Sequence, residues 1–312
     1  MSVLASSFCL ADSYPDRSLK IIVAGAAGST QDINARKVGD KLSRSLGQPV
    51  IIDNRPGAAG ILGADVTAKS KPDRYTIFMG GSNTISINPV VYSHLPYNAA
   101  RDFIPVTLAA VGSPLLVIDP SLPVKTLAEF IQYVKQRPGK LSYGSPGVGT
   151  PQHLAMELFK RLANIDIVHV PYKSSPQIVT DLMGGQIQAT IEFPSVVSSQ
   201  VLANKIRALA IVGPKRKPIH PDVPTSAEAG MPGLTIVAWN GYFVPAGTPK
   251  EIVARLNKDL ASAAKSPDYV EWLASLGSES VGNSSAEFAA FIQSENERWR
   301  KLVKDANVHI EE

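Results

Sequence analysis

Two stretches of this sequence combine the residue types that bind anions. In the first, the apolar run Leu19–Val23 leads into small and polar residues over 24–32 and then into a helical pattern. In the second, residues 141–143 lead into a glycine-rich turn over 144–149, which is again followed by a helical pattern. Unpaired backbone N–H groups and the helix dipole attract negative charge at such helix N-termini. Two of these turns, over a hundred residues apart, predict two lobes that hold one acidic ligand.

Capping residues position both turns at the start of a helix. Thr150 is a suitable N-cap, Pro151 suits the first helical position, and leucines then recur every four residues, so a helix is predicted over 151–163. Ser29 predicts a cap for the first helix, with Asp32 three residues further on.

The candidate ligand contacts come from these turns and from two further strand ends. They are Gly25, Ala26, Ala27, Gly28, Ser29, Thr30 and Asp32 in the first turn; Ser145, Gly147, Gly149, Thr150 and His153 in the second; and Ser82, Asn83, Glu192 and Phe193 at the other strand ends.

Three of these candidates allow two interpretations each. Asp32 either only caps its helix or also holds the first loop open beside the ligand. His153 either faces the ligand or lies on the surface, and Glu192-Phe193 either contacts the ligand or simply ends a strand.

Other chemistries fit the sequence less well. Neither turn has the G-x-G-x-x-G spacing or the lysine of a nucleotide site. A hydrolase using Ser145 and His153 is the alternative enzyme hypothesis, but no G-x-S-x-G elbow or acidic partner supports it. The five histidines lack metal-ligand spacing, so neither a metal nor another cofactor is predicted.

Size and charge allow two cores and give no sign of a nucleic-acid partner. The chain has 312 residues and a formal net charge of +4, from 31 basic and 27 acidic residues. Its one basic cluster, 215–217, lies between prolines and is interpreted as a solvated loop. No run of 18 apolar residues occurs.

The N-terminal segment 1–11 resembles the end of a secretory signal peptide whose basic start is missing. Its Cys9 is the only cysteine, and cleavage after Ala11 would leave a cysteine-free protein. The sequence leaves open whether Cys9 is ever retained, and it predicts an exported, periplasmic protein.

Strand and helix signals alternate almost throughout, which predicts an α/β fold with largely parallel sheets. We expect a first lobe from 12–111 and 235–312, a second lobe from 112–234, and a two-strand hinge near Val111 and Leu234.

Ordered blocks along nearly the whole chain carry a family resemblance. They are Tyr14-Pro15, 47–50, 53–58, 63–64, 87–89, 101–103, 138–141, 170–173, 181–182, 184–186, 222–225, 228–230 and 245–249. With these blocks the chain resembles the periplasmic solute receptors of the tripartite tricarboxylate transporter system, also called the Bug (Bordetella uptake gene) family.

The resemblance implies a type II periplasmic-binding-protein fold, in which two lobes close like a Venus flytrap on a small carboxylate. It implies a monomeric receptor without catalytic activity, which delivers its ligand to membrane components of the transporter. A ligand sensor for a signalling partner is the other role consistent with it. In the family, the loops matching 25–32 and 145–153 hold the carboxylate, partly through ordered water.

Departures from the family pattern bear on the ligand. Gly25 stands where relatives usually carry an aromatic residue, and Glu192-Phe193 replaces an aspartate-asparagine pair. We therefore expect an altered pocket that takes an aromatic or bulky carboxylate or dicarboxylate.

Overall fold

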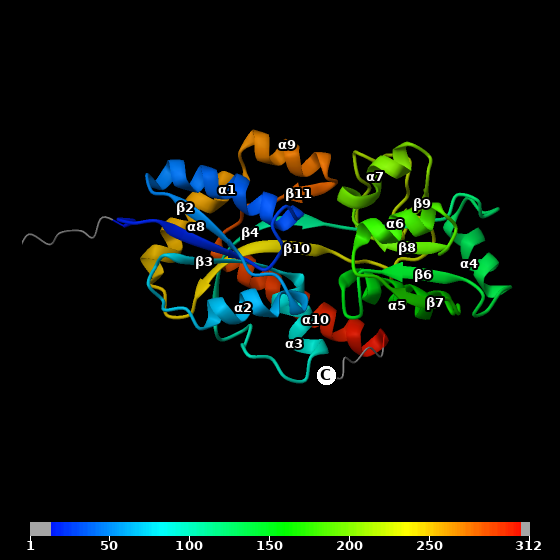
Figure 1. Cartoon of the computed structure of the whole chain (residues 1–312), viewed down its shortest axis with the longest axis horizontal. Helices are drawn as coiled ribbons and strands as arrows, with labels where there is room; N and C mark the ends of the chain where they lie inside the picture. Colours follow the sequence, from blue (N-terminus) through cyan, green and yellow to red (C-terminus); the bar gives the residue numbers. More distant parts are fainter. Residues whose placement is uncertain (1–13, 307–312) are drawn as a thin grey trace, which may run out of the picture.

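The computed structural model describes residues 14–306, so the predicted signal-peptide segment lies outside the described residues. The chain forms two α/β lobes side by side, each built on its own sheet (Figure 1). No helix among the described residues has the length and apolar character needed to cross a membrane.

Lobe 1 has a six-stranded sheet in the order β11-β4-β10-β3-β1-β2. Its strands are β1 (Leu19–Val23), β2 (Val50–Asn54), β3 (Thr76–Gly81), β4 (Phe103–Gly112), β10 (Ala238–Pro245) and β11 (Ser278–Ser280). Its helical segments are α1 (Thr30–Leu46), η1 (Ala58–Gly60), α2 (Ile61–Ala68), η2 (Ser82–Ile87), α3 (Asn88–Val91), α8 (Lys250–Ala264) and α9 (Pro267–Ser275), and α10 (Ser285–Ala306) begins in it.

Lobe 2 has a five-stranded sheet in the order β7-β6-β8-β5-β9. Its strands are β5 (Leu115–Ile118), β6 (Ser142–Ser145), β7 (Val168–Pro171), β8 (Ala189–Glu192) and β9 (Arg207–Ile211). Its helices are α4 (Leu127–Lys135), α5 (Pro151–Ala163), α6 (Ser175–Met183) and α7 (Pro194–Leu202).

The sheets are mixed, so the expectation of largely parallel sheets was wrong. The strands β1, β2 and β3 pair in parallel, as do β6, β7 and β8. However, β10 runs antiparallel to β3 and β4, and β5 runs antiparallel to β8 and β9. The antiparallel pairs involve the strands beside the connections between the lobes, where the chain reverses direction on entering or leaving a sheet.

Two adjacent segments connect the sheets. Ala238 at the start of β10 pairs with Gly112 at the end of β4. Beyond these residues, the Pro114 carbonyl accepts a hydrogen bond from Val212 N–H, and the Val212 carbonyl accepts one from Ile236 N–H, both within lobe 2.

The last helix, α10, forms a third connection that the sequence did not predict. Its first half packs in lobe 1, where Phe288 meets the Trp239 ring edge-on. Its second half contributes Trp299, Leu302 and Val303 to the buried cluster around α5 in lobe 2. We expected all of 235–312 to lie in the first lobe. The structure differs at α10, which is shared between the lobes (Figure 1).

Candidate ligand-binding cleft

The first loop is held against α1 by its own side chains. Ser29 Oγ accepts a hydrogen bond from Asp32 N–H at 3.2 Å, which confirms the predicted cap. Ile33 N–H donates to the Ser29 carbonyl. The Thr30 and Gln31 amides come earlier in the helix, where no preceding turn supplies a carbonyl acceptor.

Asp32 lies behind this loop and supports it. One carboxylate oxygen accepts from Gly28 N–H at 2.8 Å and from Arg36 Nε at 3.0 Å, and the other accepts from Asn54 Nδ2 at 3.0 Å. Burial would raise the pKa of Asp32, but these hydrogen bonds outweigh it and hold the pKa below its usual value. The same Asn54 amide also donates to the Gly25 carbonyl, so the carboxylate ties the loop to β2.

The second loop is built in the same way on α5. Thr150 Oγ accepts from His153 N–H at 3.3 Å, which confirms the predicted N-cap, and it donates to the Gly147 carbonyl at 2.7 Å. Gly149 N–H donates to His153 Nδ1 at 3.3 Å. Gly147 has a φ of 121°, a conformation that favours glycine.

A buried polar cluster lies under the second loop and rules out the serine hydrolase hypothesis. Ser145 Oγ lies 2.7 Å from His169 Nε2, so its histidine partner is His169 and not His153. Ser145 is 0% exposed and cannot reach a substrate in the cleft. His153 is buried against the His169 ring. Burial is the largest cause, and the neighbouring His169 the second, that lowers the pKa of His153 to about 4.

Two further helices of lobe 2 begin without a side-chain cap. Neither Ser174, the N-cap of α6, nor Phe193, the N-cap of α7, makes a side-chain capping hydrogen bond. Pro176 and Pro194 in these first turns have no N–H, and Val196 N–H donates to the Phe193 carbonyl. The first-turn N–H groups of Ser175, Gln177 and Ser195 remain for water or a ligand.

Two adjoining cavities of about 370 Å³ each lie between the lobes, where these helix N-termini meet. Residues from both lobes line both cavities, namely Gln31, Gln152, Ser175, Phe193, Ala238 and Asn240. None of the described residues that line them is Lys, Arg or His, and the only carboxylate is that of Glu192. The cleft thus offers backbone and side-chain hydrogen-bonding groups in place of cationic side chains.

Half of the candidate contacts lie at these cavities and half lie elsewhere. Gly25, Ser29, Thr30, Ser82, Asn83, Thr150, Glu192 and Phe193 are lining residues. Ala26, Ala27 and Gly28 are exposed at the tip of the first loop. Asp32, Ser145, Gly147, Gly149 and His153 lie behind the two loops, in the supporting hydrogen-bond networks.

Several residues that line the cavities were not predicted from the sequence as ligand contacts. Gln31 and Gln152 stand in the first turn of a helix, two residues after the predicted caps Ser29 and Thr150, and Ser175 directly follows Ser174, the N-cap of α6. That position is a signal that could have identified them. Trp239 and Asn240 reach the cleft through the pairing of β10 with β3 and β4, for which the local sequence holds no signal.

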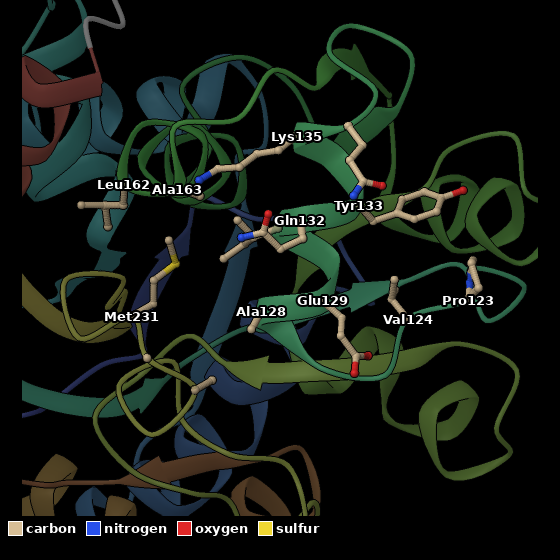
Figure 2. Close-up of a pocket in the computed structure, with 14 residues that line it drawn as sticks. Pro123, Val124, Ala128, Glu129, Gln132, Tyr133, Lys135, Leu162, Ala163 and Met231 are labelled. Carbon is tan, nitrogen blue, oxygen red and sulfur yellow. The ribbon is translucent and has the colours of Figure 1, made fainter.

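A larger cavity, of about 750 Å³, lies away from this cleft (Figure 2). It is an open groove on lobe 2 between α4, the C-terminal end of α5 and the loop at Met231. Its Leu162 is about 15 Å along α5 from Gln152, at about 1.5 Å per residue. The groove contains residues from one lobe only, so the smaller cavities between the lobes remain the better candidate site.

The described residues include no group of three or more His, Cys, Asp or Glu side chains that could hold a metal ion.

Comparison with known proteins gives the family. The family model described as "Tripartite tricarboxylate transporter family receptor" matches residues 34–308. A Pseudomonas sp. (strain P51) protein, described as the UPF0065 protein in the tcbD-tcbE intergenic region, is 38% identical over 94% of this chain and 87% of its own. The Bordetella pertussis protein BugT is 34% identical over 96% of this chain and 92% of its own.

Solved structures of similar sequence have the same fold. Rpa4515 from R. palustris, solved with adipate, is 36% identical with a TM-score of 0.86, over 95% of this chain and 99% of its own. MatC from Rhodopseudomonas palustris, with bound malate, is 31% identical with a TM-score of 0.81, over 93% of this chain and 100% of its own. The chain therefore belongs to the tripartite tricarboxylate transporter family receptors, which are periplasmic solute-binding proteins of the Bug type without enzymatic activity.

Proposed function

We propose that this protein is an exported receptor that captures a small organic carboxylate in the cleft and delivers it to the membrane components of a tripartite tricarboxylate-type transporter. The observation that carries the proposal is the meeting of helix N-termini from both lobes at two cavities without a cationic side chain. Oriented N–H groups and helix dipoles bind a carboxylate in this arrangement. The adipate and malate in the two related structures support the ligand class.

The pocket favours an aromatic or otherwise bulky carboxylate over a short aliphatic one. Phe193 lines both cavities, and the two cavities adjoin, so a flat apolar body has both room and an aromatic partner. Gly25 contributes no ring to the opposite wall.

A thermal-shift screen tests the receptor function directly. The panel contains mono-, di- and tricarboxylates, both aliphatic and aromatic, with nucleotides as controls. A ligand at 100 times its dissociation constant stabilises the folded protein by about 2.7 kcal/mol. If no carboxylate raises the melting temperature and a nucleotide does, the proposal is wrong.

Delivery to a transporter is tested separately from binding. Uptake of a bound acid into membrane vesicles that carry the transporter's membrane proteins should require this receptor. Binding without receptor-dependent uptake would favour the sensor role instead.

A further inference from the structure

Glu192 ends β8 in the lobe 2 wall of the cleft, where the N-termini of three helices meet. One oxygen, Oε1, accepts from Ser175 Oγ at 2.7 Å. The other, Oε2, accepts from Phe193 N–H at 3.2 Å and from Gln152 Nε2 at 3.4 Å. These partners belong to the starts of α6, α7 and α5 respectively.

This carboxylate is buried and has only neutral partners among these contacts. Glu192 is 0% exposed, and burial raises its pKa, which its hydrogen bonds to Ser175, Gln152 and Phe193 oppose but do not bring back to the ordinary value. A buried carboxylate without a cationic partner is costly unless hydrogen bonds and dipoles stabilise it. Here the three helix N-termini supply part of that stabilisation, and the chain's own carboxyl group already occupies the anion-attracting centre of lobe 2.

The same contacts fix which hydrogen-bonding groups lobe 2 presents to the cavities. A serine hydroxyl has one proton, and Ser175 donates it to Glu192, so the lone pairs of Ser175 are left for a ligand. Gln152 directs one N–H of its amide group to Glu192, which leaves its carbonyl oxygen as an acceptor and its second N–H as a donor. Both side chains line both cavities, so Ser175 and Gln152 offer acceptor oxygens to a ligand from this wall.

Lobe 1 has the opposite character. Ser29 Oγ accepts from Asp32 N–H, so its own proton remains free for a ligand oxygen. Thr30 and Gln31, whose amides stand in the first turn of α1, line the cavity beside it. A ligand carboxylate is therefore best placed against lobe 1.

We propose that Glu192 determines specificity by selecting a ligand with one carboxylate and, at its opposite end, a neutral or cationic hydrogen-bond donor such as an amide, hydroxyl or ammonium group. This inference rests on the proposed receptor function and names the ligand class within it. A second carboxylate at that end would face the like charge of Glu192 and the acceptor oxygens of Ser175 and Gln152. This repulsion disfavours the binding of a dicarboxylate.

Glu192→Gln reverses this preference with almost no change of shape. Two N–H donors point at Oε2, so the carbonyl oxygen of the new amide must take that place. Its NH₂ group then lies toward Ser175 and donates to it. The Ser175 proton is thereby released toward the cavity, and the negative charge is removed.

Isothermal titration calorimetry with matched ligand pairs measures the effect. The probes are adipate with its monoamide adipamate, and terephthalate with 4-carbamoylbenzoate, or the equivalent pair made from the acid that binds best in the screen. We expect the wild type to favour the monoamide by at least tenfold in dissociation constant. In Glu192→Gln the ratio should move by at least tenfold toward the diacid.

Two further variants keep the test independent of folding. Glu129→Gln makes the same change at an exposed position near the start of α4, outside the cleft, where Gln also serves in a capping box, and should leave the ratio unchanged. Ser175→Ala retains the Glu192 charge but removes the acceptor hydroxyl, and should weaken monoamide binding by several fold. It replaces Glu192→Gln as the decisive variant if thermal unfolding shows that the latter does not fold.

The outcomes separate this inference from the receptor function. A diacid bound as tightly as its monoamide by wild type, with a ratio unaffected by the substitutions, overturns the role of Glu192 and leaves the receptor intact. Failure of every carboxylate to bind would instead remove the receptor function itself.

Discussion

The imidazole rings of His153 and His169 lie with their centroids 4.4 Å apart and tilted by 38°, directly beneath the second binding loop. Each ring also supports that loop or the strand leading into it, because His153 Nδ1 accepts from Gly149 N–H and His169 Nε2 bonds to Ser145 Oγ. His153 is buried and His169 is half-buried, and burial lowers the pKa of both.

The His153 site makes stability depend on pH. The pKa of His153 falls from 6.5 to about 4 on folding, mainly through burial, so between these values the unfolded chain binds a proton that the folded chain does not. The contribution of His153 to the free energy of unfolding is therefore fully present above pH 6.5. This contribution, up to about 3 kcal/mol, is lost as the pH falls toward 4. Urea unfolding at several pH values measures the slope.

The control for this prediction is a pair of substitutions. His153→Gln keeps an acceptor for Gly149 N–H but does not titrate, so its stability should fall less steeply below pH 6.5 than that of the wild type. His94→Gln changes an exposed histidine and should follow the wild-type curve. Equal slopes in all three proteins would show that His153 is not the source.

Thr150→Val should affect both stability and ligand binding. The substitution removes the cap of α5 and the hydrogen bond to the Gly147 carbonyl, at a cost of about 1 kcal/mol. It also frees the loop that lines the cavity, so affinity should fall. Thr126→Val removes the equivalent cap from α4, far from the cleft, and should cost a similar amount while leaving affinity unchanged. Unchanged affinity in folded Thr150→Val would remove the start of α5 from the site.

Phe193→Ala should weaken binding of benzoate- or phthalate-type acids by about tenfold, since aromatic contact adds about 0.5 to 1.5 kcal/mol to area burial. Binding of a short acid such as malate should change much less. Tyr133→Ala, at the outer groove of lobe 2, is the matched aromatic control and should change neither. Tight binding of malate or glutarate and none of the aromatic acids, measured by calorimetry, would reject a bulky ligand.

Gly25→Phe is not a clean test of pocket shape. A Cβ atom at Gly25 would lie 2.7 Å from Ser29 Oγ and 2.9 Å from Gln31 Oε1. Any side chain there would displace the cap of α1 before it filled the cavity. Loss of binding in that variant would report on the loop and not on ligand size.

Ligand binding should make the molecule more compact, because a ligand held by both lobes requires a rotation at the two strand connections. Small-angle scattering should show a smaller radius of gyration at saturating ligand. Identical profiles with and without ligand would indicate a receptor that is already closed.

The sequence predicted the elements that depend on neighbouring residues. The caps at Thr150 and Ser29 are both confirmed, because each is a contact over three residues. Thr248 precedes Glu251 by three residues, a spacing typical of a capping box, but Pro249 is the N-cap of α8 and Thr248 Oγ donates to the Pro245 carbonyl instead. The hydroxyl of a possible capping residue can instead hydrogen-bond within the turn that precedes the helix.

The cleft itself was only partly predictable, for a physical reason. Loop residues that bind and loop residues that support binding have the same composition, so Ser29 and Ser145 look alike in sequence. They differ only in burial, because Ser29 lines the cavity and Ser145 is enclosed beside His169. Likewise, the place of Glu192 among three helix starts depends on the order of the strands in the sheet.

Because α10 crosses from one lobe to the other, the two ends of the described chain pack in different lobes. Tyr14 packs against Tyr75 in lobe 1, whereas Val303, near the other end, lies in the buried cluster around α5 in lobe 2. A donor and an acceptor fluorophore attached beside these two positions would follow the lobe movement as a change in energy transfer. The architecture is thus suited to conversion into an optical sensor for its own ligand.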